Sequence, residues 1–410
     1  MQAKSTRNDF PSSYRSKKEH TVVGLMSGTS LDGVDAVLVK IGASEGNAPP
    51  SVRFIRHLYL PYSEELRREI KKLCTFDTAK IDDLVYAHFG LSEWYAEAVS
   101  KLVSEAGLST DQIDAVSMHG QTVWHAPVPK NFPGPRGTVP VKGTLQLGNP
   151  SVLSQRTGIP VVADLRSADM AAGGEGAPLA PYIDSMLFGD IDEGRIVQNI
   201  GGIGNATVLP RGGDKAEVFA FDTGPGNMVL DAIVEIGTNG ELRYDPEGGI
   251  ASRGRIDGAE VEALLEDEYF TRIPPKSTGR EVYGQEFSQS FWERMDSRGA
   301  SFEDIAATAT AFTAESIARA YRDFVFPHYS IKRILVCGGG ARNKTLMNMI
   351  RERVPEDIEV TTTDSYGVPE QVREAMAFAL IGHQSLMGKA GNLPAVTGAR
   401  AEVILGVLTL

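Results

Sequence analysis

The 410-residue sequence is poor in cysteine, with only Cys74 and Cys337. The two lie far apart and outside any CxxC or Cys/His ligand spacing, so the sequence predicts neither a disulfide framework nor a zinc site, and it favours a reducing cytoplasm. No apolar run approaches the roughly 18 residues that a membrane-spanning helix needs. Residues 1–20 are polar and charged and lack the apolar centre of a secretory signal, so we expect them to form a mobile extension.

The sequence also lacks dense runs of Lys and Arg. It has 41 Lys and Arg residues against 53 Asp and Glu residues, which gives a formal net charge of −12. An acidic protein without a basic patch repels nucleic acid and anionic membranes, so we expect neither as a partner. Any bound phosphate must then be held locally, by backbone N–H groups, a metal ion or a few basic side chains. A chain of this length with 42% hydrophobic residues is expected to fold into two domains.

Glycine is abundant, with 43 residues, and it clusters at the ends of apolar segments that are typical of strands. Residues 21–41 follow the order strand, glycine-rich turn, strand, and residues 196–209 repeat that order. Helical periodicity marks segments 63–73, 81–105, 302–324 and 370–384, whereas the Pro- and Gly-rich stretch 127–140 predicts a surface loop. The pattern predicts two related α/β lobes, residues 21–190 and 191–410, with the last helices able to return to the first lobe.

The first glycine-rich turn is Gly28-Thr29-Ser30-Leu31-Asp32-Gly33. Its backbone amides and hydroxyls could donate to a phosphate, and Asp32 could hold Mg²⁺ through water. An ordinary hairpin loop is the alternative, because these residue types are common in turns. No Gly-Lys-Ser/Thr follows, so the turn is not a Walker A loop, and the strand-like continuation excludes a dinucleotide-binding fingerprint.

Three more glycine turns lie in the second half, at Gly201-Gly202, at residues 222–227 and at Gly338-Gly339-Gly340. Asp222 stands at a strand end beside such a turn, where a carboxylate could serve as a general base or merely cap the following helix. Four glycine turns in one chain favour a site where backbone approaches a ligand closely.

Four polar residues elsewhere are candidate substrate contacts. Arg166 and Asp169 follow a buried strand and could orient a polar substrate or simply form an ion pair. His119 and His125 are six residues apart, which disfavours a metal pair and favours His119 as a hydrogen-bonding group. Glu374, in the helix 370–384, could face a cleft or only favour the helix dipole.

Several of these segments are long and unusual, and they occur in a fixed order between Thr21 and the C-terminus. They are Gly24–Asp35, His119–Thr122, Gly176–Leu179, Asn199–Gly202, Phe221–Asn227, Pro275–Glu281, Cys337–Gly340 and Gly391–Pro394. Together they resemble the anhydro-N-acetylmuramic acid kinase family. The resemblance implies the two-lobed actin-like ATPase (ribonuclease H-like) fold with a cleft between the lobes, ATP and Mg²⁺ as cofactors, and a homodimer. It also implies hydrolytic opening of a 1,6-anhydro sugar coupled to phosphorylation of O6, in cell-wall recycling.

By the same likeness Asp222 is the catalytic base and Glu374 contacts the sugar. His119, Arg166 and Asp169, the polar candidates named above, are predicted to contact the substrate. The nucleotide site comprises Gly28, Thr29, Ser30, Leu31, Asp32, Gly33, Val34, Asp35, Gly201, Gly202, Gly338, Gly339 and Gly340.

The sequence departs from the family pattern at residues 164–168, Asp-Leu-Arg-Ser-Ala, which carry fewer positive charges than expected. This weakens the case for a substrate with a lactyl carboxylate and leaves a levoglucosan kinase, acting on plain 1,6-anhydroglucose, as an alternative. A nucleotide-gated binding module without turnover is an alternative of another class, which would not need Asp222 as a base.

Overall fold

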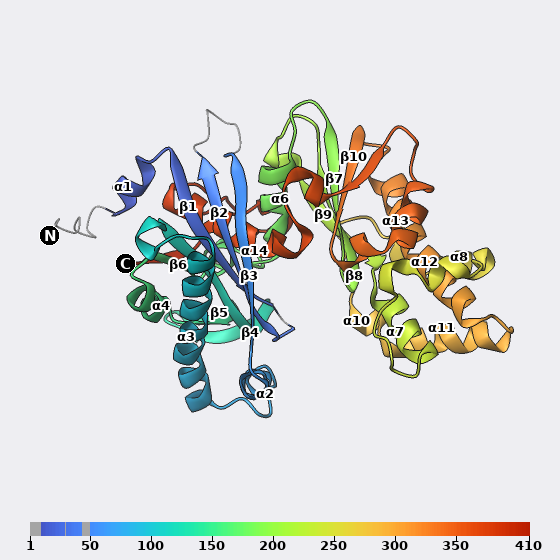
Figure 1. The fold of residues 1–410 in the computed structure, drawn as a ribbon, viewed down its shortest axis with the longest axis horizontal. Helices are drawn as coiled ribbons and strands as arrows, with labels where there is room; N and C mark the ends of the chain where they lie inside the picture. The colour runs from blue at the N-terminus through green and yellow to red at the C-terminus, as the bar shows by residue number, and fades with distance from the viewer. Residues whose placement is uncertain (1–9, 29, 43–49) are drawn as a thin grey trace. The chain divides into compact units, whose positions relative to one another are not determined.

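The computed structural model describes residues 10–28, 30–42 and 50–410. The chain divides into two compact units, Met1–Leu187 with Gln371–Leu410, and Phe188–Glu370. The C-terminal segment therefore belongs to the first unit. Each unit contains one mixed β-sheet with helices packed against it (Figure 1). This arrangement confirms the predicted α/β class.

In the first unit the strand order is β12-β6-β4-β1-β2-β3, with β5 paired to β4. Strands β1, β2 and β3 are antiparallel to one another, while β4 runs parallel to β1 and β6 parallel to β4. The strands are β1 (Glu19–Ser27), β2 (Gly33–Gly42), β3 (Val52–Pro61), β4 (Ala115–Gly134), β5 (Gly137–Leu147), β6 (Val161–Ala163) and β12 (Val407–Thr409).

The second unit repeats this topology with the order β11-β10-β7-β8-β9. Three antiparallel strands again lie on one side, and two parallel strands follow on the other. The strands are β7 (Gly194–Ile200), β8 (Ile203–Leu209), β9 (Phe219–Pro225), β10 (Ile331–Cys337) and β11 (Glu359–Thr362). Both units thus have the predicted ribonuclease H-like strand order, which explains the recurrence of strand, glycine turn and strand in the sequence.

Helix α14 crosses the sheet of the first unit at unusually short range. A Cβ atom added to Gly24 of β1 would lie 2.1 Å from the Ala375 carbonyl oxygen, and one added to Gly382 would lie 2.4 Å from the Ser117 side chain. Glycine at these points lets the helix backbone rest directly on the strands. The helices of this unit are α1 (Phe10–Arg15), α2 (Glu64–Leu73), α3 (Ile81–Glu105), α4 (Pro150–Thr157), α5 (Ser167–Ala171), α6 (Ala180–Phe188), α14 (Arg373–Leu386) and α15 (Pro394–Thr397).

The core of the second unit is built around α12, whose N-terminus carries a capping box formed by Ser301 and Asp304. The predicted helices 81–105 and 302–324 are confirmed with their bounds. The other helices of this unit are α7 (Met228–Gly237), α8 (Gly258–Leu264), α9 (Glu268–Thr271), α10 (Arg280–Tyr283), α11 (Gln285–Ser297), α12 (Phe302–Phe324) and α13 (Lys344–Arg351). Short 3₁₀ helices cover Thr110–Gln112, Lys215–Glu217, Pro246–Gly248, Ala251–Arg253, Gly339–Arg342, Thr363–Tyr366 and Glu370–Val372. Across the described ranges, no helix is both long enough and apolar enough to cross a bilayer.

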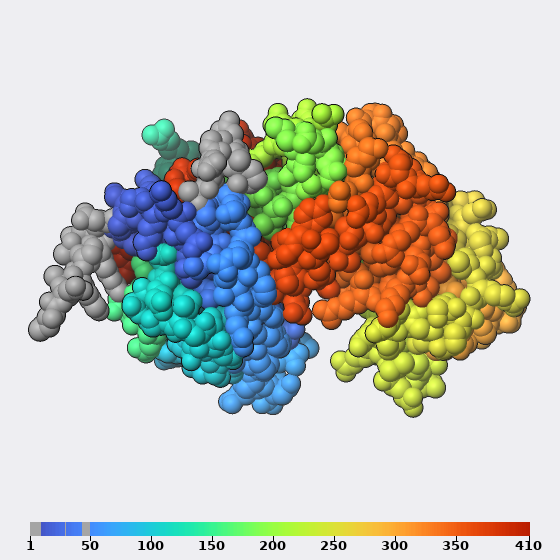
Figure 2. Space-filling model, turned by 45° about the horizontal axis from the view of Figure 1, so that its top comes forward, coloured from blue at the N-terminus to red at the C-terminus, as the bar shows by residue number. Residues whose placement is uncertain are grey.

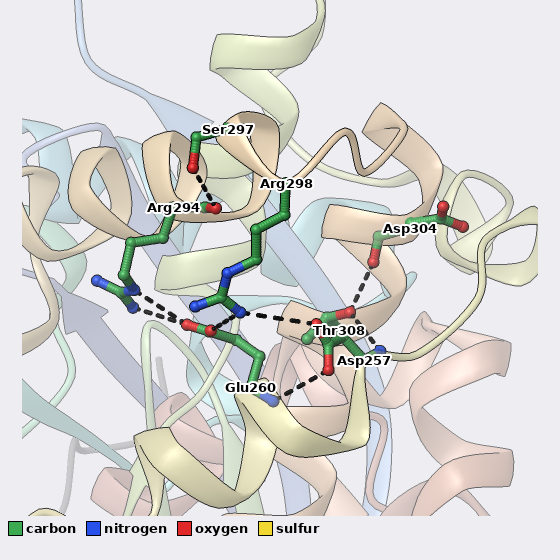
Figure 3. Close-up of polar contacts among 7 residues, drawn as sticks. All are labelled: Asp257, Glu260, Arg294, Ser297, Arg298, Asp304 and Thr308. Atoms are coloured by element: carbon green, nitrogen blue, oxygen red, sulfur yellow. Dashed lines mark hydrogen bonds and ion pairs between the residues drawn. The ribbon is translucent and has the colours of Figure 1, made fainter.

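A polar cluster joins α8 to α11 (Figure 3). The buried carboxylate of Glu260 accepts hydrogen bonds from Arg294 Nη2 at 2.9 Å and from Arg298 Nη1 at 2.9 Å. We expect Glu260→Gln to lower the free energy of unfolding by about 1–2 kcal/mol. The loss is modest because both guanidinium groups are half exposed, so water can solvate their charges once the carboxylate is gone. Urea unfolding measures the change. The exposed Glu262→Gln on the same helix is the control, and equal midpoints for both variants would contradict the role of the cluster.

Residues 127–140 lie at the surface as predicted, but the prediction of a loop is wrong, because β4 and β5 continue through them as a hairpin that turns at residues 135–136. Proline is tolerated on strands with an unpaired edge, where a missing N–H costs no ladder bond. Pro127 and Pro129 also fall in a bulge, since the register skips from Ala126 to Lys130. The high Pro and Gly content therefore gave no indication of the long β4–β5 hairpin.

The prediction of a mobile N-terminus fails from Phe10 onward, while residues 1–9 lie outside the described part. The Tyr14 hydroxyl hydrogen-bonds His383 Nδ1 at 2.8 Å, and the His20 ring stacks on Tyr14 with centroids 4.0 Å apart. Arg15 Nε donates to the Leu386 carbonyl at 2.8 Å. These contacts anchor α1 and the start of β1 to the C-terminal end of α14, which sequence periodicity could not show.

Candidate active site

The first glycine-rich turn connects β1 to β2 and is fixed from both sides. Gln121 Nε2 donates to the Gly28 carbonyl at 2.9 Å, and Tyr62 N–H donates to the Asp32 carbonyl at 2.9 Å. Within the turn, Ser30 Oγ donates to Asp32 Oδ1 at 2.6 Å, and Leu31 adopts a left-handed conformation with φ of 57°. Thr29 lies outside the described residues. Hydrogen bonds therefore hold the described residues of the turn, while Ser30 and Asp32 stay exposed.

The two glycines of this loop have different surroundings. A Cβ added to Gly33 would lie 2.6 Å from the Leu60 carbonyl oxygen, so packing of β2 on β3 requires this glycine. Apart from its chain neighbours, the nearest described atom to a Cβ added to Gly28 is Ser30 Oγ at 3.6 Å. The space over Gly28 is thus open to a ligand. Val34 is buried within β2, and Asp35 accepts a hydrogen bond from His57 Nε2 at 2.8 Å, so these two belong to the strand.

The glycine turns of the second unit meet at the ends of β7, β9 and β10. Asn227 N–H donates to the Gly201 carbonyl at 2.7 Å, and Gly226 N–H donates to the Gly202 carbonyl at 2.9 Å. Gly338 has a φ of 82°, and a Cβ added there would lie 2.6 Å from the Ile200 carbonyl oxygen. The three turns form one cluster, which we call the glycine cluster: residues 201–202, 226–227 and 338–340.

Parts of the glycine cluster remain open to a ligand. A Cβ added to Gly201 would have its nearest neighbour at 3.8 Å, and one added to Gly339 would have it at 3.5 Å. Gly340 differs, since its added Cβ would lie 2.4 Å from the Ile200 side chain, so it serves packing. Free backbone at Gly201 and Gly339 suits close approach by a phosphate or ribose.

Two cavities of the second unit border the glycine cluster, with volumes of about 640 and 750 Å³. The first is lined by Gly202, Met228, Asp231, Ala232, Glu235, Ile236, Arg280, Gly284, Gln285 and Gln289. The second is lined by Asn227, Leu230, Asp231, Arg243, Tyr244, Asp245, Pro246, Glu247, Gly339, Arg342, Asn343 and Lys344. The second cavity is large enough for a nucleoside and carries cationic side chains beside Gly339.

Asp231, which the sequence reasoning missed, lines both cavities from the first turn of α7. Burial raises its pKa to about 6. The sequence does mark this residue, because Asp231 interrupts the apolar run that starts at Met228.

Asp222 lies within β9, so the strand extends through residues that the sequence placed in a turn. Its Oδ2 accepts a hydrogen bond from Thr278 N–H at 3.0 Å, and its backbone carbonyl accepts one from the Tyr269 hydroxyl at 2.6 Å. Burial raises the pKa of Asp222, and the Thr278 hydrogen bond partly opposes that rise. A half-buried carboxylate with one oxygen fixed and a raised pKa suits proton abstraction.

The segment 275–281 supplies the partner of Asp222 and is anchored by Lys276. The Lys276 ammonium is buried and donates to the carbonyls of Tyr269 at 3.0 Å and Phe270 at 3.3 Å. Desolvation lowers its pKa to about 8. Lys276 therefore fixes the loop that positions the catalytic candidate.

In the first unit, His119, Arg166 and Glu374 come together. Arg166 Nε donates to His119 Nε2 at 2.9 Å, and His119 Nδ1–H donates to the Gly120 carbonyl at 2.7 Å. His119 is thus neutral, and burial, followed by the charge of Arg166, lowers its pKa to about 3. Burial lowers the pKa of Arg166, which Glu374 partly offsets.

Arg166 and Glu374 face a cavity of about 260 Å³ in the first unit. Its lining comprises Met26, Arg166, Ala177, Pro178, Leu179, Ala180, Ile183, Asp184, Arg373, Glu374, Ala377, Phe378 and Ile381. An apolar wall with two guanidinium groups and two carboxylates suits a small polar ligand such as a sugar. The sequence reasoning missed the ion pair between Arg373 and Asp184, although an Asp inside the apolar helix α6 was a visible signal.

Asp169 has no exposed surface. Its carboxylate accepts hydrogen bonds from Gly176 N–H at 2.8 Å, Asn392 Nδ2 at 2.7 Å and Thr397 Oγ1 at 2.7 Å. The Gly176 carbonyl in turn accepts a hydrogen bond from Arg166 Nη1 at 2.6 Å. In this conformation Asp169 fixes the loop that positions Arg166.

The lowered pKa values of two buried histidines, His119 and His383, predict that the fold loses stability in acid. His119 and His383 both have a pKa near 3 in the folded state, against about 6.5 when unfolded. The unfolded state therefore binds more protons below pH 6.5, and stability falls as the pH decreases toward 3. At pH 4.5 each histidine should lower the free energy of unfolding by about 2–3 kcal/mol. Chemical unfolding between pH 7 and 4.5 measures the slope, which the double variant His119→Asn with His383→Asn should flatten. An unchanged slope in that variant would contradict the assignment.

The described residues contain no group of three or more His, Cys, Asp or Glu side chains able to hold a metal ion together. A single carboxylate is nevertheless sufficient for Mg²⁺ when nucleotide phosphates and water complete the shell. Asp32 fits that requirement, because it is exposed and Ser30 Oγ occupies only one of its oxygens.

Comparison with known proteins gives one family over nearly the whole chain. The family model described as anhydro-N-acetylmuramic acid kinase matches residues 20–410. Two similar proteins bear the name anhydro-N-acetylmuramic acid kinase. The one from Caldanaerobacter subterraneus subsp. tengcongensis is 42% identical, and the match covers 96% of this chain and 98% of the relative. The one from Salinibacter ruber is 43% identical, and the match covers 96% of this chain and 97% of the relative.

Solved structures are more distant. Component A of the Acidaminococcus fermentans (R)-2-hydroxyglutaryl-CoA dehydratase is 11% identical with a TM-score of 0.46, covering 90% of this chain and 99% of that one. A ROK family glucokinase from Streptomyces griseus, in complex with glucose and AMPPNP, is 12% identical with a TM-score of 0.37, covering 88% and 98%.

Proposed function

Because the chain belongs to the anhydro-N-acetylmuramic acid kinase family, we propose that it opens the 1,6-anhydro ring of anhydro-N-acetylmuramic acid with water and phosphorylates the released O6. The product is N-acetylmuramic acid 6-phosphate, formed in the recycling of cell-wall sugar. The reaction uses ATP, and we place it in the cytoplasm, where both free thiols of the chain stay reduced.

The observation that carries the proposal is the environment of Asp222. Its carboxylate takes a proton from water, and the water oxygen attacks the anomeric carbon as the bond from that carbon to O6 breaks. O6 then forms the new bond to the γ-phosphorus while the bond from that phosphorus to ADP breaks. Fixing one carboxylate oxygen through Thr278 leaves the other for the water.

The remaining residues bind and orient. Arg166 and Glu374 hold sugar oxygens, with His119 and Asp169 fixing the Arg166 guanidinium. Backbone N–H groups around Gly28 and the glycine cluster hold the nucleotide. Asp32 would hold Mg²⁺ through water, and the ion would neutralise charge on the phosphates.

One feature of the sugar pocket supports a second candidate substrate. The charge of Arg373 is countered by buried Asp184, and Arg166 faces Glu374. Little positive charge is then left for a lactyl carboxylate, which favours levoglucosan as the alternative.

Mass spectrometry with ATP, Mg²⁺ and either sugar tests the proposal. We expect a 6-phosphate that has gained water from anhydro-N-acetylmuramic acid. Turnover of levoglucosan alone would keep the mechanism and replace the substrate. A phosphorylated sugar that retains its anhydro bond would contradict hydrolytic opening, and the absence of product from both sugars would overturn the proposal.

A further inference from the structure

Two oppositely charged residues line the sugar pocket of the first unit from different helices. Asp184 lies on α6, and Arg373 is the first residue of α14. Both border the cavity of about 260 Å³. Asp184 has no exposed surface, and the side chain of Arg373 is only 10% exposed. The proposed reaction gives neither residue a part, so their place in the pocket wall requires another explanation.

The two side chains form a bidentate ion pair. Arg373 Nε donates to Asp184 Oδ1 at 3.0 Å, and Arg373 Nη2 donates to Asp184 Oδ2. Two parallel N–H bonds are the geometry in which a guanidinium binds an ionised carboxylate most strongly. A buried ion that loses its counter-ion is strongly destabilising, so the two residues depend on each other. Asp184 and Arg373 therefore carry opposite charges that cancel in the pocket wall.

The local structure does not itself favour a cation at this position. Arg373 stands in the first turn of α14, where the helix dipole disfavours positive charge. The helix that follows is mostly buried and packs on β1 at the close range set by Gly24. An apolar pair would serve stability as well, because replacing a buried ion pair with apolar residues is often neutral or stabilising. The ion pair is thus better explained by an effect on the pocket than by a stabilising role.

The pocket is electrically balanced. Among the described residues that line it, four carry charge: Arg166, Asp184, Arg373 and Glu374. Two guanidinium groups and two carboxylates give a net charge of zero. Without the carboxylate of Asp184 the pocket would have one positive charge in excess. In a cavity of this volume no ligand atom is far from the lining, so the excess charge would act on any ionised group of the ligand.

This balance matters because the candidate sugars differ in charge. Anhydro-N-acetylmuramic acid carries a lactyl carboxylate, whereas levoglucosan and other plain anhydro sugars are neutral. A pocket without net charge offers the carboxylate little attraction, and a positively charged pocket would favour it. The carboxylate of Asp184 thus bears directly on which kind of sugar binds better.

We propose that Asp184 is a specificity-determining residue, which neutralises Arg373 and so keeps the pocket from selecting anionic anhydro sugars over neutral ones. The inference rests on the proposed function for the class of ligand, and it adds two residues to which that function gives no role. Arg373 is then a carboxylate-binding group that Asp184 holds occupied. Removal of the Asp184 charge alone should give a pocket that prefers a sugar with a carboxylate.

Calorimetric titration of the full chain, without nucleotide, tests this role. The two probes are anhydro-N-acetylmuramic acid and 1,6-anhydro-N-acetylglucosamine, which is the same sugar without the lactyl group. The quantity measured is the ratio of their two dissociation constants at pH 8, well above the ordinary aspartate pKa of about 3.9. Asp184→Asn removes one negative charge and nearly preserves the shape of the side chain. The double variant Asp184→Asn with Arg373→Met removes both charges.

Glu93→Gln is the matched control. The Glu93 carboxylate also binds one guanidinium, accepting from Arg156 Nε at 2.9 Å and from Arg156 Nη2 at 2.7 Å. This pair is exposed and does not line the sugar pocket. Glu93 belongs to α3, whose blue-green atoms form part of the surface seen in Figure 2. Thermal unfolding verifies that each variant is folded.

We expect Asp184→Asn to shift the ratio toward the anionic sugar by about fivefold or more. The double variant and Glu93→Gln should both keep the wild-type ratio, since neither changes the net charge of the pocket. If Asp184→Asn does not fold, Arg373→Met provides the opposite test. That variant leaves negative charge in excess, so the ratio should shift toward the neutral sugar by about the same factor.

An unchanged ratio in the folded single variant overturns the inference. So does an equal shift in the double variant, because the effect would then not come from the charge of Arg373. A wild-type protein that binds neither sugar overturns it as well. Sugar binding without turnover in the presence of ATP would instead contradict the proposed kinase activity and leave the role of Asp184 intact.

Discussion

Replacing Asp222 with Asn should reduce turnover of the anhydro sugar by about 10²–10⁴-fold, the usual contribution of a positioned general base. The amide keeps the shape of the side chain, and its oxygen can still accept the Thr278 N–H hydrogen bond, but it cannot take a proton from water. ATP affinity should stay within about twofold, because the change removes the base and leaves the glycine cluster intact. Steady-state kinetics and calorimetric titration with a non-hydrolysable ATP analogue measure the two quantities.

Asp192→Asn is the matched control, since Asp192 is an exposed carboxylate in the same unit. The pH profile adds an independent check. The ionised form of Asp222 is the active one, and burial raises its pKa, so kcat/KM should fall on acidification at a pH above the ordinary Asp value of about 3.9. Full turnover in Asp222→Asn would refute the proposed mechanism.

Replacing Gly28 with Val should lower ATP affinity by about 10–100-fold, which corresponds to about 1.4–2.7 kcal/mol of steric conflict with the nucleotide phosphates. The fold should tolerate the change, because among the described residues beyond its chain neighbours the nearest atom to the added Cβ is Ser30 Oγ at 3.6 Å. Nucleotide titration measures the affinity, and thermal unfolding verifies the fold.

Gly33→Ala provides the contrast, because its Cβ would lie 2.6 Å from the Leu60 carbonyl oxygen. That variant should lose stability first and nucleotide affinity only as a consequence. Unchanged affinity in a folded Gly28→Val protein would remove this loop from the phosphate site.

The sequence determined the elements whose signals are local. Helical periodicity predicted α3 and α12 with their observed bounds, since the hydrogen bonds of a helix are local and its apolar spacing lies within one segment. The strand and glycine-turn recurrence predicted two related α/β units, and the repeated strand order confirmed it. The sequence also singled out Asp222, Gly28, His119, Arg166 and Glu374, whose roles stay predictions.

The tertiary structure decided what depends on contacts between distant residues. Only pairing with β5 makes residues 127–134 a strand, and only the packing of α14 on β1 and β4 assigns the C-terminal segment to the first unit. The sequence offered Asp169 as a substrate contact or an ion-pair partner, but its carboxylate is enclosed by donors from Asn392 and Thr397, more than two hundred residues away. The burial that raises the pKa of Asp231 likewise arises only in the folded chain. Burial and pKa are properties of surroundings, and the chain supplies those surroundings only when it folds.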